Sequence, residues 1–197
     1  MEDIERYKDV QAYTRGDNIT IALEYANDNG YYMEFGVYRG ASINSIAESE
    51  KYKVIYGFDS FKGLPEPWIL SESNTYKVGH FTTGIPKVRS NVMLYSGFFN
   101  ETLPSWINDH DGEVAFLHID SDLYSSCKEI LTYLNDKIIN GTVIVFDELC
   151  DWNGSGKYQL WEDGEWKALN EWLDEFDRSV DPISRGREYQ SSVIVTK

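Results

Sequence analysis

Five short apolar segments, separated by helix-like or loop segments, constrain the fold of this chain more than any other feature of its sequence. They span residues 31–36, 53–59, 91–97, 114–120 and 142–146. Amphipathic helix patterns follow three of them, at 41–51, 125–139 and 166–176. In the last apolar segment, TVIVF, every residue after Thr142 is apolar, which is typical of a strand covered on both faces. Strands that alternate with helices predict an α/β fold with a parallel sheet between two helix layers.

The two ends of the chain add a hairpin and a helical extension to this pattern. Apolar runs on either side of Arg185–Gly186–Arg187 predict a closing β-hairpin, which would give the sheet an antiparallel edge. Spaced apolar positions in residues 1–28 predict one or two amphipathic helices, which we expect to form a lid over a pocket or a dimer surface. Because the sequence has no internal repeat or long linker, we predict a single domain over residues 1–197.

The charge of the chain limits its partners. It has 18 Lys and Arg against 33 Asp and Glu, a formal net charge of −15. Such a surface repels polyphosphate, so we expect no nucleic-acid partner and no anionic membrane surface as a partner. No segment approaches the ~20 apolar residues of a membrane span, and the first residues lack a signal-peptide pattern. The two cysteines, Cys127 and Cys150, form no disulfide framework, so we expect a cytoplasmic protein.

Polar or small residues end all five predicted strands. The ends are Gly36, Asp59, Gly97, Asp120–Asp122 and Asp147–Glu148. A single strand end is often polar because the chain turns there. Five such ends would share the carboxyl edge of one parallel sheet, where open α/β folds bind their ligands. The pattern therefore predicts a ligand site at this edge.

The first two strand ends favour a nucleoside ligand. Gly36 and Gly40 stand in the turn between the first strand and its helix, where they allow the backbone to approach a ligand closely. The turn lacks the middle glycine of the dinucleotide fingerprint. Asp59 follows Gly36 by 23 residues and ends the next strand, where a carboxylate can accept both ribose hydroxyls. An adenosyl or nucleotide ligand without a pyrophosphate fits this pattern.

The last two strand ends favour a metal ion. Asp120, Asp122, Asp147 and Glu148 would lie on adjacent strands, which are about 4.8 Å apart. Carboxylates this close raise each other's pKa unless a cation neutralises them. The nearest cationic residue in the sequence is Lys128, outside both segments. A hard divalent ion, Mg²⁺, would satisfy the electrostatics; the alternative is that Asp122 caps the following helix and the others face solvent.

Four segments in this order resemble a known family. They are EFGVYRGAS (34–42), GFDSFKGLPE (57–66), HIDSDLYSS (118–126) and GTVIVFDE (141–148). They are similar to motifs of class I S-adenosylmethionine (SAM)-dependent methyltransferases of the catechol O-methyltransferase kind, and more closely to the macrocin O-methyltransferase type. The resemblance covers roughly residues 31–176. It implies a Rossmann-like, mostly parallel sheet of seven strands with an antiparallel last strand.

The resemblance also implies three sets of site residues. The turn that holds the methionine end of SAM would comprise Glu34, Gly36, Tyr38, Gly40 and Ser42. The ribose and adenine would contact Asp59, Ser60, Phe61 and Gly97. The ligands of the divalent metal would be Asp120, Asp147 and Glu148.

Two positions depart from the family pattern. Glu148 is one methylene longer than the usual Asp or Asn ligand, and Leu123 stands where the catechol enzymes carry a lysine base. Asp120, Asp122 or His80 would then accept the proton of the acceptor hydroxyl, His80 from the loop that could cover the pocket. His118 lies within a predicted strand, where a packed core histidine is the simpler interpretation.

We therefore predict a SAM-dependent, divalent-metal-assisted O-methyltransferase of a small molecule. By resemblance, the acceptor is a sugar hydroxyl of a glycan or glycoconjugate precursor. One alternative assigns Asp120–Ser121–Asp122 as the D-x-D motif of a nucleotide-sugar glycosyltransferase, which leaves the 34–42 turn and the Asp147–Glu148 pair unexplained. Another is a non-catalytic nucleotide-binding domain.

Overall fold

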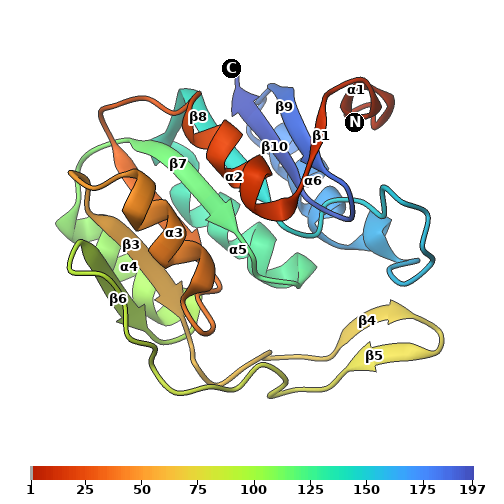
Figure 1. Cartoon of the computed structure of the whole chain (residues 1–197), viewed down its shortest axis with the longest axis horizontal. Helices are drawn as coiled ribbons and strands as arrows, with labels where there is room; N and C mark the ends of the chain where they lie inside the picture. Colours follow the sequence, from red (N-terminus) through yellow and green to blue (C-terminus); the bar gives the residue numbers. More distant parts are fainter. Residues whose placement is uncertain (1) are drawn as a thin grey trace.

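A mostly parallel eight-stranded sheet forms the centre of the protein in the computed structural model, which describes residues 2–197 (Figure 1). The strand order is β1-β9-β10-β8-β7-β2-β3-β6. The bounds are β1 (Ala12–Tyr13), β2 (Tyr31–Phe35), β3 (Ile55–Asp59), β6 (Val92–Ser96), β7 (Val114–Ile119), β8 (Ile138–Phe146), β9 (Val180–Gly186) and β10 (Ser191–Val195). β10 runs antiparallel to both β8 and β9, and the other pairs are parallel.

The predicted fold class is confirmed, but the predicted count of seven strands is wrong by one. The additional strand is β1, which pairs in parallel with β9 at the edge of the sheet. The sequence predicted only helix around it, because two extended residues are too few to show a period-2 pattern. The antiparallel last strand is β10, and β9 continues to Gly186, so the hairpin turn lies later than predicted.

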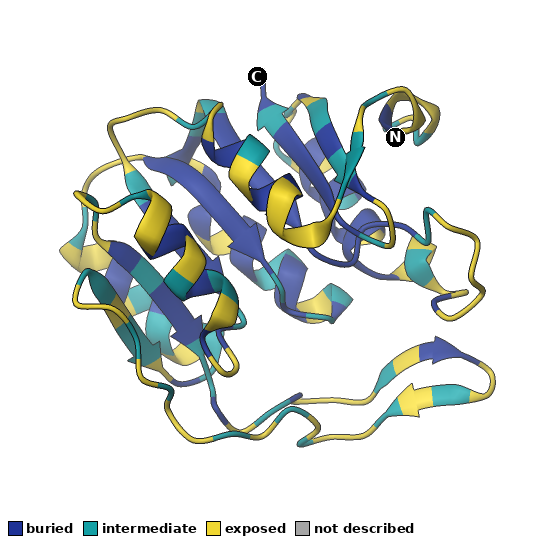
Figure 2. Ribbon diagram, in the orientation of Figure 1, coloured by how far each residue is buried: buried dark blue, intermediate teal, exposed yellow. Residues whose placement is uncertain are grey.

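Helices cover both faces of the sheet (Figure 1). One face carries α2 (Arg15–Leu23) and α3 (Ala41–Ser49), and the other carries α4 (Phe99–Asp109), α5 (Tyr124–Leu134) and α6 (Glu165–Glu175). Short 3₁₀ turns lie at Asn135–Lys137 and Trp161–Asp163. Each face has its own buried apolar cluster. All six residues of β7 are therefore buried, as the central strands in Figure 2 illustrate.

The N-terminal segment is built into this core. Tyr7 of α1 (Glu5–Lys8) is fully buried and packs edge-on against Trp166, with ring centroids 5.6 Å apart. After β1, α2 buries Ile19 and Leu23 against the sheet. A lid or dimer role for residues 1–28 stays a prediction, and its first residue, Met1, lies outside the described residues. The first turn of α2 brings Arg15 to the carboxyl edge of the sheet, where it lines the cavity described below.

Two elements of the structure have no counterpart in the sequence prediction. One is α4, whose pattern is masked by Pro104 inside the helix, although Glu101 accepts the Phe98 backbone N–H (3.0 Å) and caps its first turn. The other is a separate hairpin, β4 (Trp68–Ser71) and β5 (Asn74–Tyr76), which extends away from the main sheet (Figure 1). Both lie in segments where short, interrupted patterns give little periodicity.

The register of the parallel strands aligns the residues that follow them. Phe35 lies opposite both Phe58 and Ile119, and Ile119 lies opposite Phe146. The next residue of each strand therefore leaves the sheet at the same level. The Asp120 N–H donates to the Phe35 carbonyl (2.8 Å), and the Asp147 N–H donates to the Ile119 carbonyl (2.9 Å).

Within residues 2–197, no helix combines the length and the apolar character that crossing a bilayer requires.

Candidate active site

A cavity of about 770 Å³ opens at the carboxyl edge of the sheet. This volume lies within the usual range for small-molecule sites. The predicted site residues on its wall are Gly36, Tyr38, Asp59, Ser60, Asp120, Asp122, Asp147 and Glu148. The edge that the sequence predicted as a ligand site is therefore hollow and lined by these residues.

The glycine turn after β2 brings two backbone segments into close contact. Gly36 has φ +92°, and a Cβ at this position would lie 1.7 Å from the Asp120 carbonyl oxygen. Any other residue would push the two strand ends apart. Gly40 has φ +81° and stands immediately before α3, so the turn needs a left-handed residue there as well. The turn that follows β2 thus requires glycine at position 36 and favours it at position 40.

The Asp59 carboxylate holds the glycine turn to the end of β3. Its Oδ2 accepts the Tyr38 backbone N–H and its Oδ1 accepts the Phe61 backbone N–H, both at 2.7 Å. Tyr38 and Phe61 have φ of +49° and +53°, a strained conformation for non-glycine residues that is common at functional sites. The carboxylate thereby joins the ends of β2 and β3 on one side of the cavity.

The other residues predicted to bind SAM lie next to the cavity but are not among the described residues that line it. Gly97 donates its N–H to the Asp59 carbonyl (3.1 Å), and Phe61 is buried. Ser42 donates its hydroxyl to Glu34 Oε1 (3.0 Å), behind the glycine turn. Glu34 is fully buried. Direct contact of these residues with SAM stays a prediction, and Ser42 and Glu34 brace the turn from inside.

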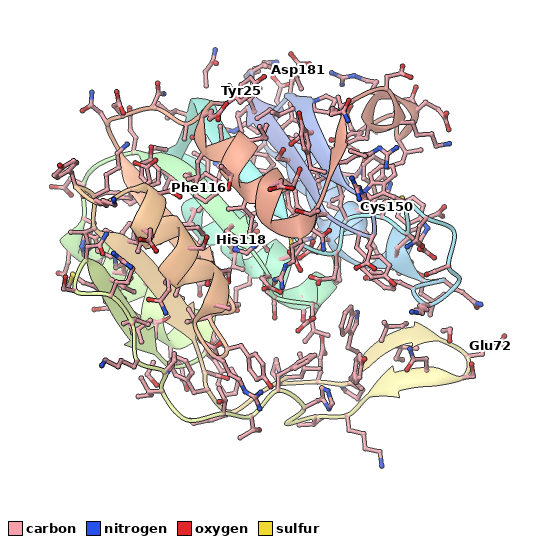
Figure 3. The ribbon with its side chains drawn as sticks, in the orientation of Figure 1. Tyr25, Glu72, Phe116, His118, Cys150 and Asp181 are labelled. Atoms are coloured by element: carbon pink, nitrogen blue, oxygen red, sulfur yellow. The ribbon has the colours of Figure 1, made fainter. Side chains whose placement is uncertain are left out.

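A buried histidine continues this network to the acidic end of the cavity. His118 Nδ1 lies 2.9 Å from Glu34 Oε2, and its Nε2 lies 3.6 Å from Asp147 Oδ1. Figure 3 shows His118 in the interior, in the carboxyl-terminal half of β7. Burial alone would lower its pKa, but the neighbouring carboxylates of Asp147 and Glu34 raise the pKa of His118 to about 10. His118 is therefore a buried core residue, as expected, and its ring also lies between two carboxylates of the site.

The predicted acidic cluster is present at the ends of β7 and β8. Carboxylate oxygens of Asp120, Asp122 and Glu148 lie within 4.8 Å of one another, and those of Asp120 and Asp147 lie equally close with a His118 nitrogen. The three predicted metal ligands thus belong to two overlapping groups that share Asp120. Glu148 Oε2 is buried without a hydrogen-bond partner in the described chain, so the oxygen-rich set has a free ligand atom for a divalent cation.

The pKa values in this cluster diverge. Burial, followed by the charge of Asp147, raises the pKa of Asp120 to about 7. Burial also acts to raise the pKa of Asp147, but the His118 hydrogen bond and the Arg15 charge outweigh it and lower this pKa to about 2. Burial and neighbouring carboxylates hold the pKa values of Asp122 and Glu148 well above their ordinary values. Asp147 is thus the carboxylate that stays ionised throughout the neutral range.

Two residues of the cluster were not predicted from the sequence. Arg15 donates its Nε to Asp147 Oδ1 (2.7 Å) and its Nη2 to Asp120 Oδ2. It lies more than 100 residues from either acid in the chain, and no local motif indicates this contact. Glu165 is fully buried, and its Oε2 accepts the Glu148 N–H (2.9 Å). Its position four residues before Leu169, on the apolar face of α6, was a detectable signal.

His80 is not among the described residues that line the cavity. Its ring stacks on Tyr76, with centroids 4.4 Å apart, and lies 4.4 Å edge-on from Phe81. Both of those aromatic residues do line the cavity, so His80 supports its wall from behind. This position does not favour His80 as the base, whereas Asp120 and Asp122 face the cavity.

Comparison with solved structures shows the fold. CalS11, a calicheamicin methyltransferase, superposes with a TM-score of 0.69 at 22% identity, over 90% of this chain and 78% of that chain. NovP, an O-methyltransferase, gives 0.64 at 20% identity, over 92% and 80%. MycE, from the mycinamycin pathway and solved with Mg and SAH, gives 0.58 at 16% identity, over 90% and 48%. No match to the chain was found among curated proteins.

A family model extends the comparison from fold to sequence. The model described as macrocin O-methyltransferase (TylF) matches residues 14–159. The matched region begins just before α2 and includes the glycine turn, Asp59 and the whole acidic cluster except Glu165. Because this match spans about three quarters of the chain, the protein belongs to the macrocin O-methyltransferase family and is a SAM-dependent O-methyltransferase.

Proposed function

We propose that this protein transfers the methyl group of SAM to a hydroxyl of a neutral sugar or sugar-bearing precursor, with the assistance of a divalent metal ion. The observation that carries the proposal is the convergence of Gly36, Asp59, Asp120 and Asp147 on one cavity. Family membership contradicts both the glycosyltransferase and the non-catalytic alternatives. The two cysteines are free and buried, which supports the expected cytoplasmic location.

Asp120, Asp147 and Glu148 would hold the metal ion. Their oxygens form the hard donor set that Mg²⁺ prefers, and the unpartnered Glu148 Oε2 points to a missing ligand. A divalent cation bound there would lower the pKa of an acceptor hydroxyl. Asp147, with its lowered pKa, would be available as a charged ligand at neutral pH.

Other residues of the cavity would align SAM with the acceptor and accept the proton of the acceptor hydroxyl. The Asp59 carboxylate would orient the ribose of SAM while it holds the Tyr38 and Phe61 backbones. Asp122 faces the cavity from a left-handed conformation (φ +62°), and burial raises its pKa, which makes this carboxylate a stronger proton acceptor than an exposed one. Fixing donor and acceptor in line is the larger part of catalysis for a reactive sulfonium.

The outer wall of the cavity supports a sugar acceptor. It is aromatic, and comprises Trp68, Tyr76, Phe81, Tyr158 and Tyr189. Flat aromatic faces bind the apolar faces of sugar rings and leave the hydroxyls free for polar partners. The CalS11 protein is described as a TDP-rhamnose 3′-O-methyltransferase. The acidic cluster at the opposite wall would repel a phosphate close to the reacting hydroxyl, so the methylated sugar itself would be uncharged.

A methyl-transfer assay tests this function. Labelled SAM is incubated with a panel of neutral monosaccharides and glycosides, with Mg²⁺ or with excess EDTA. We expect transfer to at least one sugar hydroxyl, and its loss in EDTA or in Asp147→Asn. Asp111→Asn, an exposed acid outside the cavity, is the matched control. Full transfer in EDTA would remove the metal from the proposal, and transfer only to non-sugar hydroxyls would remove the acceptor.

A further inference from the structure

We propose that Arg15 is a tethered occupant of the metal position, which a divalent cation must displace before the enzyme is loaded. The inference rests on the metal-binding part of the proposed function. In the described structure the guanidinium spans the two carboxylates that are the central expected ligands, with Nε on Asp147 Oδ1 (2.7 Å) and Nη2 on Asp120 Oδ2. A guanidinium fork and a metal ion compete for the same carboxylate lone pairs.

A cation at this end of the cavity offsets the repulsion between the carboxylates gathered there. Five acids gather at this end of the cavity: Asp120, Asp122, Asp147, Glu148 and Glu165. The positive groups within hydrogen-bond or ion-pair distance of Asp120 and Asp147 in the described chain are Arg15 and His118. With no metal bound, Arg15 relieves the repulsion that would otherwise open the cluster.

Of these two cations, only Arg15 is free to leave. The His118 side chain has no solvent exposure, whereas 48% of the Arg15 side chain is exposed. An exposed guanidinium can rotate into water at little cost, because its charge is rehydrated there. His118 stays in place as the permanent partner of Asp147, and Arg15 is the exchangeable one.

The backbone below Arg15 is fixed, so the displaced side chain stays at the mouth of the cavity. Tyr13, two residues before Arg15, lies next to Gly186 in the β1–β9 pair, and its carbonyl accepts the Arg187 N–H (3.0 Å). Thr14 caps α2 through its hydroxyl, which accepts the Asp17 N–H (3.3 Å). The exchange is therefore a side-chain rotation and needs no opening of α2.

The position of Arg15 has no explanation within its own helix. It is the first residue of α2, where the helix dipole favours acidic side chains and disfavours cations. An arginine placed there against the dipole is stabilised by the carboxylates of the opposite strand ends. This favours a role at the cluster over a role in α2.

Mn²⁺ binding tests the inference without any turnover. The affinity of the full-length protein for Mn²⁺ is measured by electron paramagnetic resonance of the free ion, without SAM or acceptor. We expect Arg15→Gln to bind Mn²⁺ about 10-fold more tightly than the wild type, a difference of about 1.4 kcal/mol. Arg89→Gln is the matched control, because Arg89 pairs with Glu48 on α3, away from the cavity, and its removal changes the net charge equally. Its affinity is expected to stay at the wild-type value.

Equal or weaker Mn²⁺ binding by Arg15→Gln would overturn the inference, because Arg15 would then be a support of the ligands and not their competitor. If no variant binds Mn²⁺, the inference and the metal part of the proposed function both fail, and the EDTA arm of the transfer assay tells whether methyl transfer survives. Should Arg15→Gln not fold, the Nε–H resonance of Arg15 in the wild type, assigned by its loss in Arg15→Lys, gives the answer. It must shift on saturation with Mg²⁺, and an unchanged resonance contradicts displacement.

Discussion

At the scale of single residues, one buried chain of polar contacts connects the two halves of the site. Ser42 contacts Glu34, Glu34 contacts His118, and His118 faces Asp147. The glycine turn expected to hold the donor is therefore joined to the expected metal ligands through protein groups alone. A substitution of His118 should therefore disturb both the glycine turn and the expected metal ligands.

The charge of His118 makes a pH-dependent contribution to stability. Its pKa in the folded protein, about 10, lies above the ordinary 6.5, so its contribution is complete below about pH 6.5 and is lost as pH rises through about 10. We expect His118→Gln to lower the free energy of unfolding at pH 6 by about 3–5 kcal/mol, the usual effect of breaking a buried ion pair.

Urea unfolding of the wild type and His118→Gln between pH 6 and pH 10 provides the measurement. The difference in unfolding free energy should shrink steadily toward pH 10. His80→Gln makes the same chemical change outside the cavity and should show a small, flat difference. A His118→Gln effect that is constant with pH would mean that the histidine acts through packing and not through charge.

At the scale of elements, the β4–β5 hairpin supplies Trp68 and Tyr76, two of the aromatic residues that line the cavity. Trp68 packs edge-on against Tyr158 with ring centroids 5.5 Å apart, and the Leu160 N–H donates to the Leu70 carbonyl (3.1 Å). The hairpin is thus held against the loop that follows β8. It lines the cavity with Trp68, Leu70, Asn74 and Tyr76, a mixture of aromatic and polar side chains that suits acceptor recognition.

Truncation at Trp68 should separate acceptor binding from donor binding. We expect Trp68→Ala to raise the acceptor KM about 3- to 10-fold, in line with the loss of one aromatic stacking contact. The Kd of SAM, measured by calorimetry, should be unchanged, and Trp68→Phe should retain most of the acceptor affinity. Equal losses of SAM and acceptor affinity would argue that the hairpin shapes the whole cavity.

The N-terminal elements are expected to contribute strongly to stability. Tyr7 is fully buried between Trp152 and Trp166, with ring centroids at 6.4 and 5.6 Å. We expect Tyr7→Ala to lower the free energy of unfolding by about 3–5 kcal/mol, as for other large buried aromatic residues. Chemical denaturation measures this, with the exposed Tyr52→Ala as a control expected within about 0.5 kcal/mol of wild type. A small change in the unfolding free energy of Tyr7→Ala would mean that the packing of α1 contributes little to stability.

At the scale of the whole molecule, the protein has a strongly negative charge and gathers part of it in one cavity. A ligand that binds only the folded state stabilises the protein against unfolding, because binding removes folded molecules from the unfolding equilibrium. We expect SAM and Mg²⁺, each at about 100 times its Kd, to add about 2.7 kcal/mol apiece to the unfolding free energy. Thermal unfolding should show a rise in Tm for each, with EDTA reversing the Mg²⁺ part. An unchanged Tm with SAM would contradict donor binding by the apo protein.

The limits of sequence reasoning are visible in this cavity. The strand ends were predictable, because apolar runs locate β2, β3, β7 and β8, and a parallel sheet places their ends together. The glycine and acidic motifs then indicated which residues at this edge would bind a nucleoside and a metal ion. Arg15 was not predictable, because its contact with Asp147 depends on how α2 packs across the sheet. The burial of His118 was predictable from the strand pattern, but that pattern does not say which carboxylates surround the ring.

The pairing of β1 with β9 joins nearly the first and nearly the last secondary structure of the chain. During synthesis on the ribosome, residues 12–13 emerge early but must wait for residues 185–186 before they can dock. Until that moment, the β1–β9 pair cannot help to hold Arg15, the first residue of α2, against the strand-end acids. β1 can therefore join the sheet only late in synthesis. A translation product that ends before β9 would lack the β1–β9 pair, and the acidic strand ends would repel one another without this support for Arg15.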